Sequence, residues 1–336
     1  MNVGEDLLTV VDLRVWFPVK TGGGLRRTKR EVKAVDGVSL TVRRGETLGL
    51  VGESGCGKST TGLALLRLVE PTGGRVLLGD IDVTAADRRQ LRALRQRVTM
   101  VFQDPYASLN PRRTIAASVA EPLEVHGLHP GQQQRARRVA DLLEMVGLGP
   151  QFLRRHPHEL SGGQRQRASI ARALAVEPEL IVLDEPIASL DVSVQAQVMN
   201  LLSRLQDELG LTYVFVAHDL AAVQHVSDRV AVMYLGRIVE EGTRDDVYHH
   251  PAHPYTEALL SAVPLPDPPR ERERRRIVLT GDVPSPLSPP SGCHFRTRCP
   301  KVFDPCADVD PALHPVDGDR PDGTVVACHL HGVVAR

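Results

Sequence analysis

The sequence predicts an α/β protein built on a parallel sheet, followed by a small, loop-rich extension that contains cysteines. Patterns typical of strands and of helices alternate between residues 46 and 239, as in a sheet with helical crossovers. A glycine-rich loop stands between an apolar run and a helical pattern near residue 55. After Val263 the composition changes, because 13 of the chain's 25 prolines lie beyond it.

The glycine-rich loop fits G-x-x-x-x-G-K-[ST], the phosphate-binding P-loop. The apolar run at 48–51 predicts a buried strand before it, and residues 60–68 predict a helix after it. The glycines allow backbone N–H groups and the helix N-terminus to converge on phosphate oxygens. Lys58 is expected to contact the β- and γ-phosphates, and Ser59 to bind Mg²⁺. The predicted nucleotide-binding residues are Gly52, Glu53, Ser54, Gly55, Cys56, Gly57, Lys58, Ser59 and Thr60.

A second apolar run, at residues 180–183, ends in Asp184 and Glu185. A central parallel strand delivers such carboxylates to its C-terminal edge, where a P-loop also lies. Asp184 is placed to complete the Mg²⁺ shell and Glu185 to polarise the attacking water, because phosphoryl transfer needs charge neutralisation and a positioned nucleophile. The alternative is a charged cap after a buried strand. With a P-loop in the same chain, the pair predicts nucleotide hydrolysis.

A second anion-binding motif lies between these two, at Ser161, Gly162, Gly163 and Gln164, before a helical pattern at 168–175. Ser161 is a candidate N-cap, and the glycines leave N–H groups free at the helix start. Two phosphate sites for one nucleotide suggest a composite pocket. With the motif LSGGQ at residues 160–164, the sequence resembles the ATP-binding-cassette (ABC) family.

The resemblance implies a P-loop ABC ATPase with a RecA-like parallel sheet core, an antiparallel β subdomain and a helical subdomain at about residues 114–175. It also implies ATPase subunits that pair head to tail, with each ATP between the P-loop of one subunit and the signature of the other. Gln103 matches the Q-loop, which contacts Mg²⁺ and water and couples to the membrane subunits. Residues 188–191 (ASLD) match the D-loop, whose common form is SALD, so Ala188 and Ser189 are transposed relative to the family pattern. His218 matches the switch histidine of the γ-phosphate, whereas alone it would indicate a structural histidine at a strand end.

The family also implies an aromatic side chain that stacks on adenine near the N-terminus. Trp16 and Phe17 are the two candidates, and the family position best matches Phe17. Alternating strand residues face opposite sides, so one of the pair is expected to pack in the sheet. Residues 18–31 are predicted to form an extended hairpin loop, whose basic cluster at 26–30 indicates a solvated charge run rather than a lipid or partner contact.

Composition excludes several classes of protein. Lys plus Arg and Asp plus Glu both count 41, so no basic footprint favours nucleic acid. The chain has no run of 18 apolar residues, and its acidic start predicts no signal peptide, so the expected location is the cytoplasmic face of the membrane, with the chain peripheral. Without an internal repeat, the second cassette must come from another chain. A soluble cassette ATPase acting on nucleic acid or ribosomes is the distant alternative; such proteins usually carry two cassettes, a coiled-coil insertion or a basic face.

Four of the five cysteines lie beyond residue 263, at Cys293, Cys299, Cys306 and Cys328. A loop-rich piece of this size has too little core for easy stability, and a metal or disulfides would compensate. Disulfides are disfavoured in the cytoplasm, so metal ligation is the preferred interpretation. The spacings are not the usual zinc C-x2-C pairs, and a four-cysteine iron–sulfur cluster suits them at least as well. Zinc and free thiols stay open.

The tail motifs HPYTEALL (253–260), GDVPSP (281–286) and GCHFRTRC (292–299) resemble the C-terminal extension of oligopeptide and dipeptide importer ATPases. Residues 27–29, 34–39 and 104–111 look like those of the F-type (DppF/OppF-like) subunit. The resemblance implies pairing with a D-type ATPase, and a complex with two permeases and an extracytoplasmic peptide-binding protein. Related proteins carry a 4Fe-4S cluster on the matching cysteines, which implies the same here. The expected domains are residues 1–263, the nucleotide-binding domain, and 264–336, the extension. Nickel, glutathione, sugars or antimicrobial peptides are alternative cargoes, because selectivity belongs to other subunits.

Overall fold

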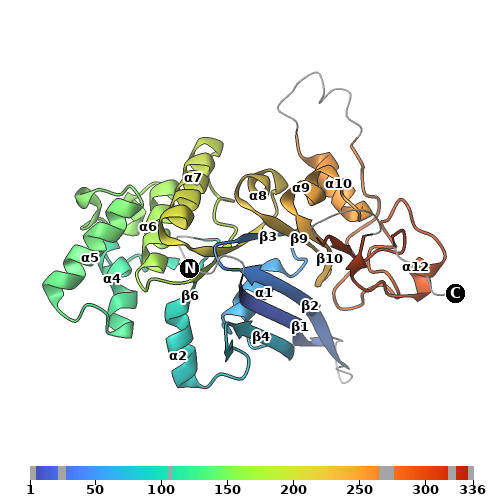
Figure 1. The fold of residues 1–336 in the computed structure, drawn as a ribbon, viewed down its shortest axis with the longest axis horizontal. Coiled ribbons are helices and arrows are strands. Elements are labelled where there is room, and N and C mark those ends of the chain that lie inside the picture. Colours follow the sequence, from blue (N-terminus) through green and yellow to red (C-terminus); the bar gives the residue numbers. More distant parts are fainter. Residues whose placement is uncertain (1–4, 22–27, 105–107, 265–275, 317–322, 332–336) are drawn as a thin grey trace. The chain divides into compact units, whose positions relative to one another are not determined.

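The structure is a computed structural model that describes residues 5–21, 28–104, 108–264, 276–316 and 323–331. Figure 1 labels the helices and strands of these residues. The chain divides into two compact units. The first, called here the signature unit, contains residues 1–7, 42–46 and 85–216. The second, called the P-loop unit, contains residues 8–41, 47–84 and 217–336.

The signature unit holds three parallel strands in the order β8-β7-β6. These strands are β6 (Val98–Val101), β7 (Leu180–Asp184) and β8 (Thr212–Ala217). Every residue of β7 and β8 is buried, as their continuous apolar runs require. The helices α2 (Arg88–Arg97) and α7 (Val192–Leu209) belong to the same unit. The parallel strands bear out the predicted α/β class.

Three further helices of this unit pack on one another: α4 (Ile115–His126), α5 (Gln132–Met145) and α6 (Gly162–Leu174). Two 3-10 turns, η1 (Pro150–Phe152) and η2 (Pro157–Glu159), connect α5 to α6. The side chain of Thr114 accepts the Ala117 N–H at the start of α4, and Gly127 ends the helix with φ of 68°. These helices occupy the stretch for which the sequence predicts a helical subdomain.

The P-loop unit contains the antiparallel sheet that the family resemblance implies. Its strand order is β2-β1-β4-β5, and the pairs β1/β4 and β4/β5 are antiparallel. The strands are β1 (Asp6–Thr21), β2 (Thr28–Arg43), β4 (Gly73–Leu78) and β5 (Ile81–Asp82). The predicted loop over 18–31 was too long, because strand structure continues to Thr21 and resumes at Thr28.

A second group of strands in this unit has the order β3-β9-β10-β12-β11. The pair β3/β9 is parallel, and β9/β10, β10/β12 and β12/β11 are antiparallel. Their bounds are β3 (Thr47–Val51), β9 (Arg229–Tyr234), β10 (Arg237–Thr243), β11 (His314–Pro315) and β12 (Val325–Val326). The helices are α1 (Lys58–Leu65), α8 (Leu220–Val226), α9 (Arg244–His249), α10 (Pro254–Ala262) and α12 (Pro305–Asp308).

The C-terminal extension is loop-rich, as predicted, but it also adds a strand to a sheet. In β12, Val325 and Val326 pair with Glu241 and Glu240 of β10. Two residues are too short a run for a sequence pattern to reveal. Parts of two features named above fall outside the described residues: residues 26–27 of the basic cluster and residues 105–107 of the segment 104–111.

Candidate nucleotide site

The P-loop lies between β3 and α1, with Lys58 as the first residue of the helix. The Lys58 side chain is 4% exposed, and its Nζ donates to the Gly52 oxygen at 2.8 Å and to the Glu53 oxygen at 2.9 Å. The ammonium group is therefore held inside the curve of the loop, where the two carbonyls orient it. A single buried cation in a ring of backbone groups is the arrangement that suits a polyphosphate.

Two glycines of the loop occupy backbone conformations that a side chain would disturb. Gly57 has φ of 110°, and a Cβ atom there would lie 2.1 Å from the Ala34 oxygen. Gly52 has φ of 152°, and its Cβ would lie 2.2 Å from the Met233 oxygen. The close approach of neighbouring backbone explains why the motif needs glycine at these two positions. Cys56 is buried, and burial raises the pKa of its thiol, which fits a packed side chain rather than a reactive one.

The remaining predicted P-loop residues are Glu53, Ser54, Gly55, Ser59 and Thr60, and Ser54 and Gly55 are exposed. Two contacts to Glu53 were not predicted from the sequence. The Glu53 N–H donates to the hydroxyl oxygen of Tyr255 at 2.8 Å. The guanidinium of Arg298 donates to both Glu53 carboxylate oxygens, at 2.7 and 3.0 Å. No local motif marks these partners, because they lie 202 and 245 residues away in sequence.

The signature unit brings Gln103 and Glu185 together. Gln103 Nε2 donates to Glu185 Oε2 at 2.8 Å, and Asp184 is buried at the end of β7. Glu185 has φ of 44°, which is unusual for a residue other than glycine, and its N–H donates to the Val216 oxygen at 2.8 Å. Strained residues of this kind concentrate at functional sites. The end of β7 therefore presents two carboxylates and one amide in a defined arrangement.

The signature motif caps α6 as the sequence predicts. The Ser161 hydroxyl accepts the Gln164 N–H at 3.3 Å, and the Gln164 side chain accepts the Ser161 N–H at 2.9 Å. A Cβ on Gly163 would lie 2.4 Å from Val194 Cγ1, and one on Gly162 would lie 3.2 Å from Leu190 of the D-loop. The glycines therefore allow α6 to start close to α7 and to the D-loop.

The two remaining motif positions belong to the P-loop unit. His218 follows β8 and is exposed, and the neighbouring Asp219 caps α8 by accepting the Ala221 N–H at 2.8 Å. Phe17 is 40% exposed near the end of β1.

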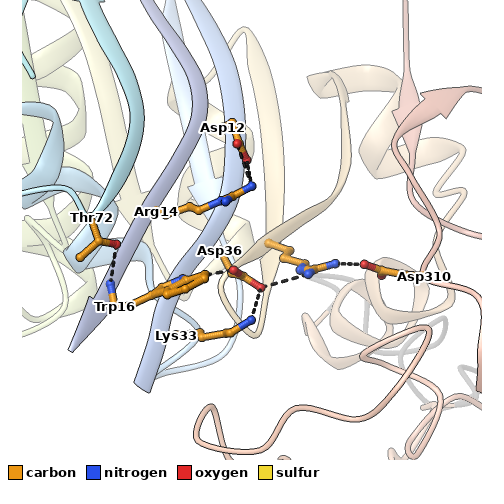
Figure 2. A network of polar contacts seen from close by, with 8 residues as sticks. Asp12, Arg14, Trp16, Lys33, Asp36, Thr72 and Asp310 are labelled. Atoms are coloured by element: carbon orange, nitrogen blue, oxygen red, sulfur yellow. Dashed lines mark hydrogen bonds and ion pairs between the residues drawn. The ribbon is translucent and has the colours of Figure 1, made fainter. Parts of the chain in front are cut away.

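The Trp16 side chain contacts two neighbouring residues of the P-loop unit. Its Nε1 donates to Asp36 Oδ1 at 3.1 Å, and the Lys33 ammonium lies 4.6 Å from the ring centre. Figure 2 shows the Asp36 carboxylate in contact with both Trp16 and Lys33. Arg237 in turn pairs with Asp36 and with Asp310. Of the two aromatic candidates, Phe17 is the one that offers an exposed ring.

The four cysteines of the extension lie within electrostatic reach of one another. Burial, and then the charges of Cys306, Cys328 and Cys299, raise the pKa of Cys293 to about 11. All four are free thiols. Within the described residues, however, no three Cys, His, Asp or Glu side chains gather closely enough to hold a metal ion. The predicted metal site therefore gains no support from these side-chain positions.

None of the helices in the described ranges is long and apolar enough to cross a membrane. The described residues therefore provide three features of a nucleotide site: a P-loop, two adjacent carboxylates at the end of β7, and a glycine-rich signature that caps α6. Gln103, Asp184, Glu185 and the signature lie in the signature unit, and the P-loop, Phe17 and His218 lie in the P-loop unit.

Comparison with known proteins matches two family models: "ABC transporter" over residues 35–188, and "Oligopeptide/dipeptide transporter, C-terminal region" over residues 239–306. The oligopeptide transport ATP-binding protein OppF of Salmonella typhimurium is 53% identical over 91% of this chain and 92% of its own length. AppF of Bacillus subtilis, with the same description, is 48% identical over 97% and 98%.

Among solved structures, a dimeric ATP-binding cassette bound to ADP and Pi in a post-hydrolysis state is 30% identical. The match covers 70% of this chain and 98% of the chain in that structure, with a TM-score of 0.61. The chain therefore belongs to the ABC transporter family, as an ATP-hydrolysing subunit of the oligopeptide and dipeptide transporter type.

Proposed function

We propose that the chain powers the import of oligopeptides or dipeptides through a membrane complex by binding and hydrolysing ATP. The printed names of the relatives support this cargo. The observation that carries the catalytic part is the hydrogen bond between Gln103 and Glu185 beside the buried Asp184. The expected position of the chain is peripheral, on the cytoplasmic face of the membrane.

In this proposal the P-loop N–H groups, with Lys58 and Thr60, bind the phosphates of ATP. Ser59, Gln103 and Asp184 hold Mg²⁺, which neutralises charge on the phosphates when bound. Phe17 stacks on adenine, because its ring is exposed whereas Trp16 is engaged by Asp36. The signature residues Ser161, Gly162, Gly163 and Gln164 complete the pocket of the partner subunit.

Glu185 is proposed to polarise the attacking water, with His218 contacting the γ-phosphate. The Gln103 amide donates to the Glu185 carboxylate, so the carboxylate is oriented before any substrate arrives. Glu185→Gln should bind MgATP as the wild type does but hydrolyse it about 10²–10⁴-fold more slowly, which is the usual contribution of a general base. Glu179→Gln, which removes a carboxylate just before β7 that pairs with Arg44 and Arg97, is the matched control. Turnover by Glu185→Gln at the wild-type rate would remove Glu185 from this role.

We propose that the working ATPase is a heterodimer with a D-type cassette, docked on two permeases that receive peptide from a binding protein. Because one pocket uses the signature of the partner chain, the isolated subunit should be a poor ATPase. Affinity purification from detergent-solubilised membranes tests this proposal by identifying the co-purifying chains. Two multi-span permeases and a second cassette ATPase would support it, and the attached binding protein would distinguish peptides from nickel, glutathione, sugars or antimicrobial peptides. Recovery with ribosomes or nucleic acid alone would contradict it.

We further propose that residues 264–336 form the extension and residues 1–263 the nucleotide-binding domain, and that Cys293, Cys299, Cys306 and Cys328 bind a 4Fe-4S cluster. Burial, and then the charges of neighbouring thiols, raise the pKa of Cys293, Cys299 and Cys328, and a cationic metal centre would favour the thiolate forms. Such a cluster would cross-link the loops of the extension. Iron and sulfide quantification with visible absorbance, on anaerobically purified protein, tests this. Zinc without iron would overturn the cluster, as would protein free of both metals.

A further inference from the structure

The P-loop of this chain carries a carboxylate, at Glu53, in a loop built to receive a polyphosphate. An unpaired carboxylate there would repel the phosphates, because like charges that are close and partly desolvated interact strongly. In the structure the carboxylate is paired: both of its oxygens accept from the Arg298 guanidinium, at 2.7 and 3.0 Å. The Arg298 side chain is 7% exposed and that of Glu53 is 28% exposed. This is a two-pronged, largely buried ion pair rather than a surface contact.

Arg298 is itself held in place by an aromatic cluster made by residues 234, 255 and 295. The Phe295 ring lies 5.2 Å from the Tyr234 ring and 5.4 Å from the Tyr255 ring, and those two rings lie 4.8 Å apart. All three rings are at most 1% exposed. The Phe295 carbonyl also accepts the Arg298 N–H at 3.0 Å. The cluster therefore fixes the segment that carries Arg298 onto β9 and α10.

The same cluster contacts the backbone of the P-loop. The hydroxyl oxygen of Tyr255 accepts the Glu53 N–H at 2.8 Å, so one residue of the loop is tied at its backbone and at its side chain. Lys58 Nζ also donates to the Glu53 carbonyl oxygen at 2.9 Å. Any displacement of Glu53 therefore shifts an acceptor of the lysine that is proposed to contact the phosphates.

We infer that Arg298 and Tyr255 are positioning residues of the P-loop, through which the C-terminal extension and α10 set the affinity for MgATP. Arg298 cancels the charge of Glu53 and holds the carboxylate to one side of the loop, and Tyr255 fixes the loop backbone. Neither residue contacts the nucleotide in this inference. It rests on the proposed assignment of the P-loop as the nucleotide site.

The test measures MgATP binding to the purified full chain, with thermal unfolding recorded for each variant. Arg298→Ala leaves Glu53 unpaired beside the phosphates and should weaken binding about tenfold, as expected for losing a hydrogen-bonded charge pair. The double variant Glu53→Gln/Arg298→Ala removes the offending charge as well, and should recover binding to within about threefold of the wild type. Lys301→Ala is the matched control, because Lys301 pairs with Glu257, outside the P-loop; it should bind as the wild type does.

Three outcomes would overturn the inference. Wild-type affinity in Arg298→Ala would show that the pair does not act on the site. Equal loss in the single and double variants would show that Arg298 acts by packing and not through the Glu53 charge, and equal loss in Lys301→Ala would show a general effect of the extension. A wild-type chain that binds no MgATP would contradict the proposed nucleotide site itself.

Discussion

Alanine at Gly57 should disturb the P-loop more than alanine two residues earlier, at Gly55. Both glycines have positive φ, 110° at Gly57 and 80° at Gly55. Both substitutions therefore carry backbone strain of about 1–2 kcal/mol. Their surroundings differ: a Cβ at Gly55 would meet nothing within 4 Å, and one at Gly57 would lie 2.1 Å from the Ala34 oxygen and 2.8 Å from Met233 Cε.

The clash sets the difference between the two variants. A Cβ at 2.1 Å from a carbonyl oxygen cannot be accommodated without moving backbone, and overpacking of this kind costs about 1–3 kcal/mol beyond the strain. The displaced backbone is at the N-terminus of α1, directly before Lys58. Because a misplacement of about 1 Å in a binding loop can cost a hundredfold in function, Gly57→Ala should lose at least ~10-fold in MgATP affinity.

Urea denaturation and MgATP titration of both variants against the wild type measure the two effects. Gly55→Ala should lower the free energy of unfolding by about 1–2 kcal/mol, which is the backbone strain alone. Gly57→Ala should lose more on both measures. Equal behaviour of the two variants, or wild-type affinity in Gly57→Ala, would refute the argument from backbone approach.

Two further predictions concern His253 and Phe17, which both lie in the P-loop unit. Burial lowers the pKa of His253 to about 3, so the folded protein binds fewer protons than the unfolded chain between pH 3 and 6.5, and stability should fall as pH drops through this range. His253→Asn keeps a side-chain acceptor for the Tyr255 N–H at the start of α10. In urea denaturation, its free energy of unfolding should fall less steeply with falling pH than that of the wild type. An equally steep fall would show that His253 does not cause this pH dependence. Phe17→Ala should weaken MgATP binding by about 1–3 kcal/mol, the usual worth of base stacking, without changing the unfolding midpoint. Trp16→Ala should lower the unfolding midpoint without weakening MgATP binding. Weaker binding in Trp16→Ala and unchanged binding in Phe17→Ala would make Trp16 the stacking residue.

Local patterns sufficed for the elements whose geometry is set within a few residues. Ser161 caps α6 as predicted, within the four residues 161–164, and the strand that ends at Asp184 is buried throughout. The error over residues 18–31 has the opposite origin: a glycine-rich, basic stretch looks like a loop, whereas β1 continues to Thr21 and β2, its neighbour in the sheet, starts at Thr28.

Short motifs identify the chemistry of this protein, because the P-loop, the acidic pair and the signature each need only short, fixed spacings along the chain. Which side chains support that chemistry depends on the folded chain. Gln103 orients Glu185 across 82 residues, and Arg298 neutralises Glu53 across 245. Such pairs leave no periodicity in the sequence, because they form only when the folded chain closes long loops and buries opposite charges together.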